Sequence, residues 1–137
     1  MCAFCRIVNG SELAHIVYED EDSIAFLDRR PVAEGHSLVV PRTHARTLLD
    51  VDPTSAGALM IAATHVARIV DRALGPDGLT VFQTNEVAGG QSVFHVHLHL
   101  VPRWQGDNLV APWTAKLAEV DDLARVRLTI ARTGESD

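Results

Sequence analysis

The sequence contains no apolar run of the roughly 18 to 20 residues that a membrane-spanning helix needs. Its first residues also lack the basic start and apolar core of a secretory signal. Positive charge is in deficit, with 12 Lys and Arg against 18 Asp and Glu and a formal net charge of −6 when histidine is neutral. Long nucleic acids usually bind a surplus of positive charge, so they are excluded as the expected partner. We therefore expect a cytoplasmic protein that contacts neither membrane nor nucleic acid and that holds any phosphate by local donors.

Cysteine is scarce as well, because Cys2 and Cys5 are the only two, in a single C-x-x-C at the start of the sequence. One such pair cannot staple a fold, and it lies outside any thioredoxin-like strand–helix–strand pattern. The spacing suits two thiolates on one tetrahedral zinc ion. Alone it is a weak signal, so a zinc site and a pair of reduced thiols both remain open.

Internal repeats, low-complexity segments and linkers are also absent from the 137 residues. A hydrophobic fraction of 47% argues against a disordered chain, and this length suits one domain with a real core. We therefore expect a single domain over residues 1–137.

Hydrophobic patterning predicts strands, a long helix, further strands and a last helix, in that order. The expected strands are residues 16–19, 23–28, 37–41, 79–84 and 93–101. Asp52 followed by Pro53 is a helix-start signal, and apolar residues then recur at helical spacing as far as Leu74. A C-terminal helix is expected from about Asp121 to Ala131. The hairpin-like connections predict an α+β fold with a five-stranded antiparallel sheet.

Seven histidines stand out in so short and acidic a chain, and three of them alternate with apolar residues. His95, His97 and His99 are two residues apart on a predicted strand, so their side chains should share one face at separations of about 6 to 7 Å. Three imidazoles in a row would repel one another when protonated, so a plain solvent-facing stripe is a poor explanation. Metal ligation and phosphate chemistry with an imidazole nucleophile both fit this pattern.

Several segments together resemble the histidine triad (HIT) family. The matching segments are residues 17–20, 25–28, 35–44 and 85–100, the last reading NEVAGGQSVFHVHLHL. The resemblance covers roughly residues 2–104 and leaves 105–137 as a C-terminal extension, and it implies a HIT-like fold. The Gly-Gly-Gln-Ser lead-in at 89–92 is similar to the Hint branch. The nucleotidyl transferases of the superfamily carry Gln where this chain has His99, which argues against that branch.

In that family the middle histidine attacks the α-phosphorus of a nucleotide, and water then releases the nucleoside monophosphate. The resemblance therefore implies that His97 is the nucleophile. His36 and His99 match donors that offset the charge on the phosphoryl oxygens. The other implied contacts are Gln91 and Ser92 to the phosphate or leaving group, Asn85 to the phosphate and Asp28 to the ribose hydroxyls.

The loop after Asn85 departs from the family pattern. Many relatives carry Gly two residues later, whereas this chain carries Val87. Because a β-branched residue disfavours positive φ, we expect this loop to differ from theirs.

Bacterial relatives with the same N-terminus bind a structural zinc ion. The matching ligands are Cys2, Cys5, His44 and His95. A closed site of two thiolates and two imidazoles would brace the reaction site without taking part in the reaction. The alternative is a pair of reduced thiols with His95 beside the phosphate, as in relatives that lack the cysteines. His15 and His65 are left without a role.

Dimeric relatives imply a homodimer for this chain as well. In those relatives the segment after the histidine strand reaches the partner's active site, so Trp113 becomes a candidate contact at the edge of the substrate.

The function implied by the resemblance is hydrolysis of purine nucleoside phosphoramidates or related adenylates through a nucleotidyl-histidine intermediate, with no metal required for the chemical step. One alternative is a dinucleoside polyphosphate hydrolase that uses the same residues on a different leaving group. Another is a nucleotide-sensing module in which turnover is incidental.

Overall fold

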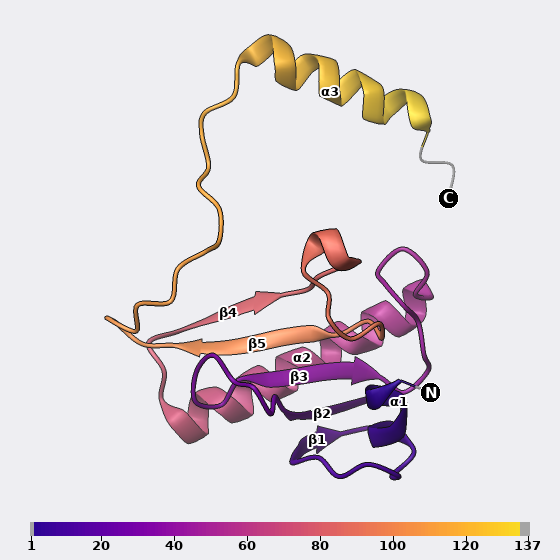
Figure 1. Ribbon diagram of the computed structural model, residues 1–137, viewed down its shortest axis with the longest axis vertical. Helices are drawn as coiled ribbons and strands as arrows, with labels where there is room; N and C mark the ends of the chain where they lie inside the picture. Colours follow the sequence, from indigo (N-terminus) through magenta and orange to yellow (C-terminus); the bar gives the residue numbers. More distant parts are fainter. Residues whose placement is uncertain (1, 135–137) are drawn as a thin grey trace. The chain divides into compact units, whose positions relative to one another are not determined.

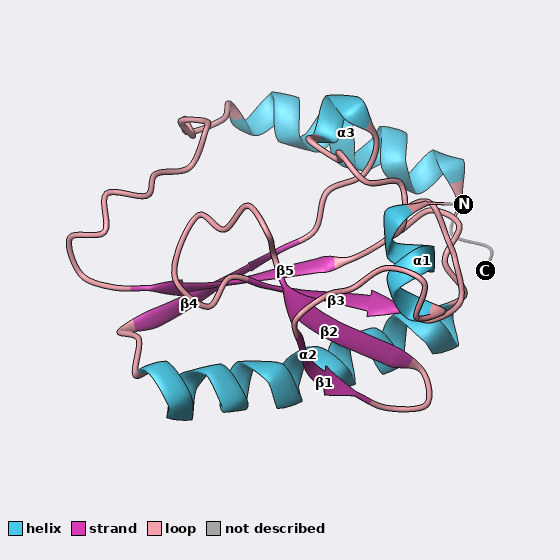
Figure 2. Cartoon of the chain, turned by 60° about the horizontal axis from the view of Figure 1, so that its bottom comes forward, coloured by secondary structure: helices cyan, strands magenta, loops and turns pink. Residues whose placement is uncertain are grey.

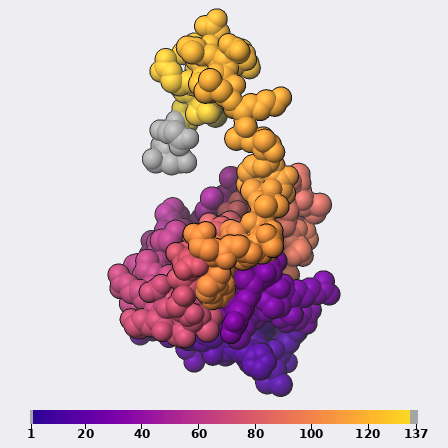
Figure 3. All heavy atoms as spheres, turned by 90° about the vertical axis from the view of Figure 1, so that its left-hand side faces the viewer, coloured from indigo at the N-terminus to yellow at the C-terminus, as the bar shows by residue number. Residues whose placement is uncertain are grey.

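A computed structural model describes residues 2–134, so the single domain expected over residues 1–137 extends beyond the described residues at both ends. The chain divides into two compact units, one ending at Asp107 and one beginning at Asn108, and each is described by itself. The first unit holds the whole sheet (Figure 1), and its segments pack as one continuous body from indigo to the orange of β5 (Figure 3). No helix among the described residues combines the length and apolarity that crossing a membrane requires.

Five strands form one antiparallel sheet, as the sequence predicted. They are β1 (Ile16–Glu19), β2 (Ser23–Leu27), β3 (Ser37–Pro41), β4 (Gly78–Phe82) and β5 (Leu98–Arg103). Their order in the sheet is β1-β2-β3-β5-β4, so the last strand of the sequence lies between β3 and β4. His99 is therefore flanked on both sides, opposite Leu38 of β3 and Phe82 of β4.

The long helix α2 (Pro53–Leu74) has the bounds that its capping residues predicted. The carboxylate of Asp52 accepts the N–H of Ser55 over 3.2 Å, and Gly75 ends the helix in the left-handed conformation. The helix lies along one face of the sheet (Figure 2). The core between them consists of Ala25, Val39, Leu59, Ala62, Ala63, Val66, Val70, Leu98 and Leu100.

A short helix that the sequence analysis did not predict, α1 (Ala3–Val8), packs on the opposite face of the sheet. The thiol of Cys2 caps it by accepting the N–H of Cys5 over 3.2 Å. Phe4 anchors it in a second apolar cluster, together with Ile24, Phe26, Leu38 and Val40. This packing ties the C-x-x-C segment to the middle of the sheet.

The strand expected over residues 93–101 begins only at Leu98. Upstream, the N–H of Val96 donates to the carbonyl oxygen of Ala45 over 2.7 Å, so this segment bonds to the loop after β3 instead of to a neighbouring strand. Only His99 of the three alternating histidines therefore lies within regular strand. His95 and His97 lie in the irregular segment that leads into it.

The second unit contains α3 (Val120–Thr133), close to the expected helix over 121–131. Within the described part of this unit Leu109 is half-buried, and the other large apolar side chains are exposed. They are Val110, Trp113, Leu117, Val120, Leu123, Val126, Leu128 and Ile130.

The turn before β3 requires a glycine at position 35. Gly35 has a φ of 82°, and a methyl group there would run into Leu74 of α2 and come within 3.3 Å of Pro102 of β5. Gly35→Ala should therefore lower the free energy of unfolding by about 2 kcal/mol or more, measured by urea titration. The control is Gly57→Ala in α2, where a methyl group meets nothing within 4 Å. This substitution should raise the free energy of unfolding by about 0.5–1 kcal/mol. A Gly35→Ala protein that unfolds at the wild-type urea concentration would contradict this account.

Candidate functional site

The ends of several strands bring the predicted phosphate-site residues together. His36 precedes β3 and His99 lies within β5, and these strands pair so that Leu38 is opposite His99. Asp28 follows β2, and its backbone N–H donates to the carbonyl oxygen of His36 over 2.9 Å. His97 lies in the segment that leads into β5. Sheet pairing thus joins residues that are far apart in the sequence.

A chain of hydrogen bonds fixes the tautomers of His36 and His99. The N–H of Val32 donates to Nδ1 of His36 over 3.2 Å, so the proton of the neutral ring is on Nε2. That Nε2–H donates to Nδ1 of His99 over 2.9 Å, and His99 must then carry its own proton on Nε2. Asp28 supports this chain, with Oδ2 at 3.5 Å from Nε2 of His36 and Oδ1 accepting the N–H of Arg30 over 2.9 Å.

The hydrogen bond of His97 leaves this ring in the opposite tautomer. Its Nδ1–H donates to the backbone carbonyl oxygen of His95 over 2.6 Å. When the ring is neutral, Nε2 therefore carries a lone pair and no proton. The ring centroid of His97 lies 4.8 Å from that of His99. A bare nitrogen beside a proton-donating ring suits nucleophilic attack on a phosphate.

Burial keeps these three rings neutral near pH 7. It lowers the pKa of His36 and of His97, and it lowers the pKa of His99 to about 4, with a further contribution from the neighbouring rings. The Asp28 carboxylate opposes each of these shifts without reversing it. Neutral imidazole is the nucleophilic form, so the environment of His97 favours that reactivity.

Two phenylalanines that were not predicted as site residues contact rings of the histidine triad, which is His95, His97 and His99. Phe82 of β4 stacks on His99, with ring centroids 4.3 Å apart and planes 7° apart. Phe4 of α1 meets the His97 ring edge to face, with centroids 5.0 Å apart. Alternation could not have found Phe82, because its place opposite His99 depends on strand register. Phe4 lies between the two cysteines, in the short helix that the Cys2 thiol caps.

Gln91 lies beneath the loop that precedes the triad. Its amide oxygen accepts the N–H of Glu86 over 2.7 Å, and its amide nitrogen donates to the carbonyl oxygens of Arg46 (2.7 Å) and Val93 (3.1 Å). The side chain is 4% exposed. Its polar atoms are thus engaged in holding the loop to its neighbours.

Glu86 in this loop has φ 64° and ψ 168°, a region that residues other than glycine rarely adopt. Its carboxylate pairs with the Arg46 guanidinium through two contacts of 2.8 Å, and Arg46 lies 4.2 Å from the ring centre of Phe94. These contacts hold the unusual backbone in place. In the loop that was expected to differ because of Val87, the positive φ falls one residue earlier, on Glu86.

Asn85 and Ser92 present different surroundings. The amide oxygen of Asn85 accepts the N–H of Leu48 (2.7 Å) and the amide of Gln83 (2.8 Å), and its nitrogen donates back to Gln83 over 2.7 Å. Ser92, in contrast, is exposed. Of these two, Ser92 has the side chain that a ligand reaches more readily.

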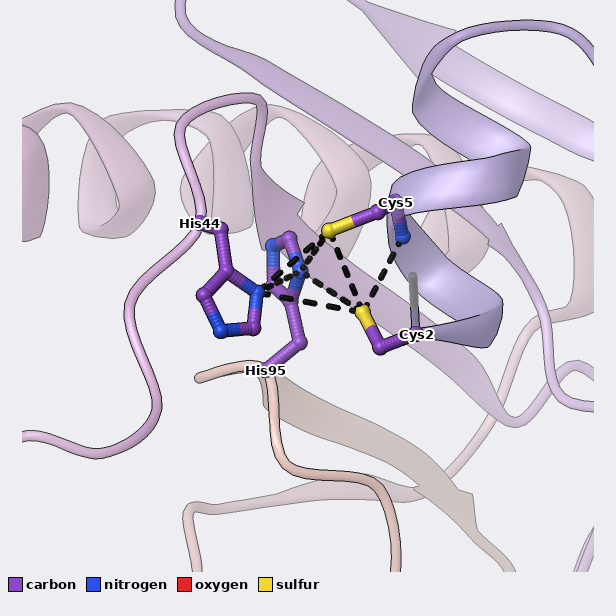
Figure 4. A group of neighbouring side chains, drawn as sticks. All are labelled: Cys2, Cys5, His44 and His95. Carbon is purple, nitrogen blue, oxygen red and sulfur yellow. Dashed lines mark hydrogen bonds between the residues drawn. The ribbon is translucent and has the colours of Figure 1, made fainter.

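A second cluster contains His95, the first histidine of the triad, together with Cys2, Cys5 and His44 (Figure 4). The thiols of Cys2 and Cys5 and the Nδ1 atoms of His44 and His95 converge there, and one ligand atom from each lies within 4.8 Å of all the others. The two sulfurs are 3.2 Å apart, and Nδ1 of His95 is 3.5 Å from each. The residues come from α1 and its cap, the loop after β3 and the segment before β5.

The donor set of this cluster fits a tetrahedral zinc ion. The Nε2–H of His95 donates to the carbonyl oxygen of Pro41 over 2.8 Å, so the lone pair of Nδ1 faces the thiols. Such a second hydrogen bond is the usual way in which a metal-binding histidine is oriented. Two thiols and two imidazoles close the coordination sphere, as in a structural zinc site.

A further group, formed by Asp28, His36 and His99, also converges but fits a cation poorly. Nε2 of His36 carries a proton in the position where a metal would bind, because Nδ1 already accepts the N–H of Val32. Of the three residues, His99 has the group that suits a phosphate, because its Nε2–H can donate to a phosphoryl oxygen.

Comparison with known proteins agrees with this geometry. Residues 9–106 match the HIT domain. Adenylylsulfatase HINT3 of Arabidopsis thaliana is 34% identical over 110 residues, which are 80% of this chain and 56% of that protein. The crystal structure of a member of the HIT family from Bacillus subtilis has a TM-score of 0.92 and 34% identity, covering 99% of both chains.

A zinc-bound histidine triad family protein from Mycobacterium smegmatis has a TM-score of 0.76 and 36% identity, covering 98% of this chain and 97% of that one. The family match spans most of the chain, and the fold is shared along almost its whole length. The chain therefore belongs to the HIT family, whose members bind nucleotides and hydrolyse or transfer them.

Proposed function

We propose that the protein hydrolyses purine nucleoside phosphoramidates and related adenylates through a covalent nucleotidyl intermediate on His97. The observation that carries this proposal is the 2.6 Å hydrogen bond from Nδ1 of His97 to the carbonyl oxygen of His95, which leaves Nε2 with a free lone pair. The likeness to an adenylylsulfatase supports an adenylate as one substrate.

The reaction has two steps at the α-phosphorus. In the first, Nε2 of His97 attacks the phosphorus, the bond to the leaving group breaks, and the leaving group takes up a proton from solvent. His99, with its proton on Nε2 and its Nδ1 held by His36, donates to the phosphoryl oxygens and offsets their growing charge. In the second step water attacks the phosphorus and releases a proton to solvent, the N–P bond breaks, and the monophosphate leaves with His97 restored.

The other site residues divide between direct contact and support. We assign Ser92, which is exposed, to the phosphate or the leaving group and Asp28 to the ribose hydroxyls. The internal hydrogen bonds of Gln91 and Asn85 favour support of the loop that borders the phosphate over direct contact with it. This assignment differs from the contacts that the family resemblance implied for these two residues.

We assign Cys2, Cys5, His44 and His95 to one structural zinc ion. When bound, the ion supplies a cross-link between α1, the loop after β3 and the segment before β5, without an open position for chemistry. His95 is then held at its ring while its carbonyl oxygen holds His97.

A homodimer remains our expectation for the assembly. The exposed apolar side chains of residues 108–134 support it, because such surface is normally covered by a partner. Trp113, 76% exposed, is our candidate for a contact at the substrate edge. Nucleic acid is not expected as a partner, and a cytoplasmic location stays a prediction.

Replacing His97 tests its role as the nucleophile. His97→Ala should reduce kcat for adenosine phosphoramidate by about 10⁴-fold or more, because no other group can form the intermediate. Affinity for adenosine monophosphate, measured by calorimetry, should change by less than about tenfold. The control is His65→Ala, a helix histidine that stacks on Tyr18 and should leave kcat unchanged. Wild-type turnover by His97→Ala would refute the assignment.

The leaving group separates the proposal from its alternatives. A higher kcat/KM for the phosphoramidate than for a diadenosine polyphosphate favours the proposed substrate class, and the reverse order favours the polyphosphate hydrolase. Tight monophosphate binding with negligible turnover of every substrate would point to a sensing module.

The zinc content of the purified protein tests the metal site. Purified protein should contain about one zinc per chain by atomic emission, and His44→Ala should lose it and unfold at a lower temperature, because the cross-link is removed. The matched control is His15→Ala, an exposed histidine outside the cluster, which should keep both its zinc and its unfolding temperature. A wild-type protein that contains no zinc would return His95 to the phosphate site.

The neutral form of His99 makes the stability of the protein depend on pH. The folded-state pKa of His99 is about 4, below the value of about 6.5 expected in the unfolded chain. The unfolded chain therefore binds more protons between these values, and the stability contributed by neutral His99 is complete above about pH 6.5 and lost as the pH falls towards 4. The urea midpoint should fall over this window in the wild type and fall less in His99→Gln. His15→Gln should retain the wild-type pH dependence, and equal slopes for wild type and His99→Gln would contradict the assignment.

A further inference from the structure

Phe82 occupies a position that packing in the core does not explain. It lies on β4 at the edge of the sheet, its side chain is 39% exposed, and it belongs to neither apolar cluster of the described residues. A large apolar side chain on an edge strand is a liability, because it displays apolar surface beside unpaired backbone groups. The contact that its buried part makes therefore needs an explanation.

That covered face lies on the imidazole of His99. Phe82 and His99 are directly opposite one another in the β4–β5 register, and their rings are almost parallel, 7° apart in angle and 4.3 Å apart between centroids. The edge-strand phenylalanine thus lies flat on one face of a triad ring.

The stack on Phe82 restricts the rotation of the His99 ring, which its hydrogen bond alone does not. The bond from His36 holds His99 at one atom, Nδ1, and the torsion between Cβ and an imidazole ring is intrinsically broad. A second, planar contact on the ring face fixes the plane in which the remaining N–H lies. The two contacts together determine the direction of the Nε2–H.

We propose that Phe82 is a positioning residue for His99: its ring fixes the imidazole plane so that the Nε2–H stays directed at the phosphoryl oxygens, and it keeps water from that face. The inference rests on the proposed function, in which His99 donates to the phosphoryl oxygens. Phe82 would hold that donor in the required direction before the substrate reacts. The other titratable groups that face His99 are His97, His36 and Asp28, and Phe82 leaves their contacts with one another intact.

The test compares Phe82→Leu, which keeps an apolar side chain and loses the planar contact, with Phe82→Tyr, which keeps both. Phe82→Leu should lower kcat for adenosine phosphoramidate by roughly tenfold or more and change KM by less than about threefold, because only transition-state donation is impaired. Phe82→Tyr should retain kcat within about threefold. NMR titration of the histidine rings, without substrate, should show the pKa of His99 higher in Phe82→Leu than in wild type or Phe82→Tyr.

The matched control is Val81→Ala, the neighbouring residue of the same strand, which is 44% exposed and faces the other side of the sheet opposite Leu100. It perturbs β4 without touching His99, so kcat and the His99 titration should stay at wild-type values. A double-mutant cycle completes the comparison, because Phe82→Leu should have little further effect on kcat in a His99→Gln background.

The inference is overturned if Phe82→Leu leaves both kcat and the His99 titration unchanged, if Phe82→Tyr loses as much activity as Phe82→Leu, or if the losses in the cycle add. A wild-type protein that turns over no nucleotide would instead refute the proposed function. The His99 titration, which needs no substrate, then decides the role of Phe82 by itself.

Discussion

The hydrogen bond between Nδ1 of His97 and the carbonyl oxygen of His95 is the contact on which the rest of the site depends. His95 makes two further contacts, since its Nε2–H is bonded to Pro41 at the end of β3 and its Nδ1 faces the two thiols. One residue thereby links a strand, a cysteine cluster and a candidate nucleophile. Because the carbonyl moves with the backbone that carries the ring, any displacement of His95 also displaces the group that sets the tautomer of His97.

The same arrangement explains how an acidic protein with a net charge of −6 can accommodate a phosphate. Burial holds His36, His97 and His99 in their neutral forms, so the site offers directed N–H groups and a lone pair instead of a positive field. The rings thus bring no positive charge for the nearby Asp28 side chain, 3.5 Å from His36, to cancel. Specific donors at short range therefore replace the basic surface whose absence the composition revealed.

Much of the fold was accessible from the sequence, because α2 is delimited by local signals such as the Asp52 cap and the strands by alternation. The candidate metal ligands came from family resemblance, since spacing alone could not show that Cys2 lies next to His44. Local patterning failed where tertiary contacts prevail. The N–H of Val96 bonds to a loop, so β5 begins later than the alternation indicates. The stacking of Phe82 depends on strand register, which alternation does not determine.

The loop over residues 83–94 has a consequence for the thermodynamics of ligand binding. Its backbone is already held by Gln91, by Asn85 and by the pairing of Arg46 with the strained Glu86. The conformational entropy of ordering this segment is therefore lost when the chain folds, not when a nucleotide arrives. Binding should then show a small entropic penalty from the loop, and nucleotide release should need no melting of it.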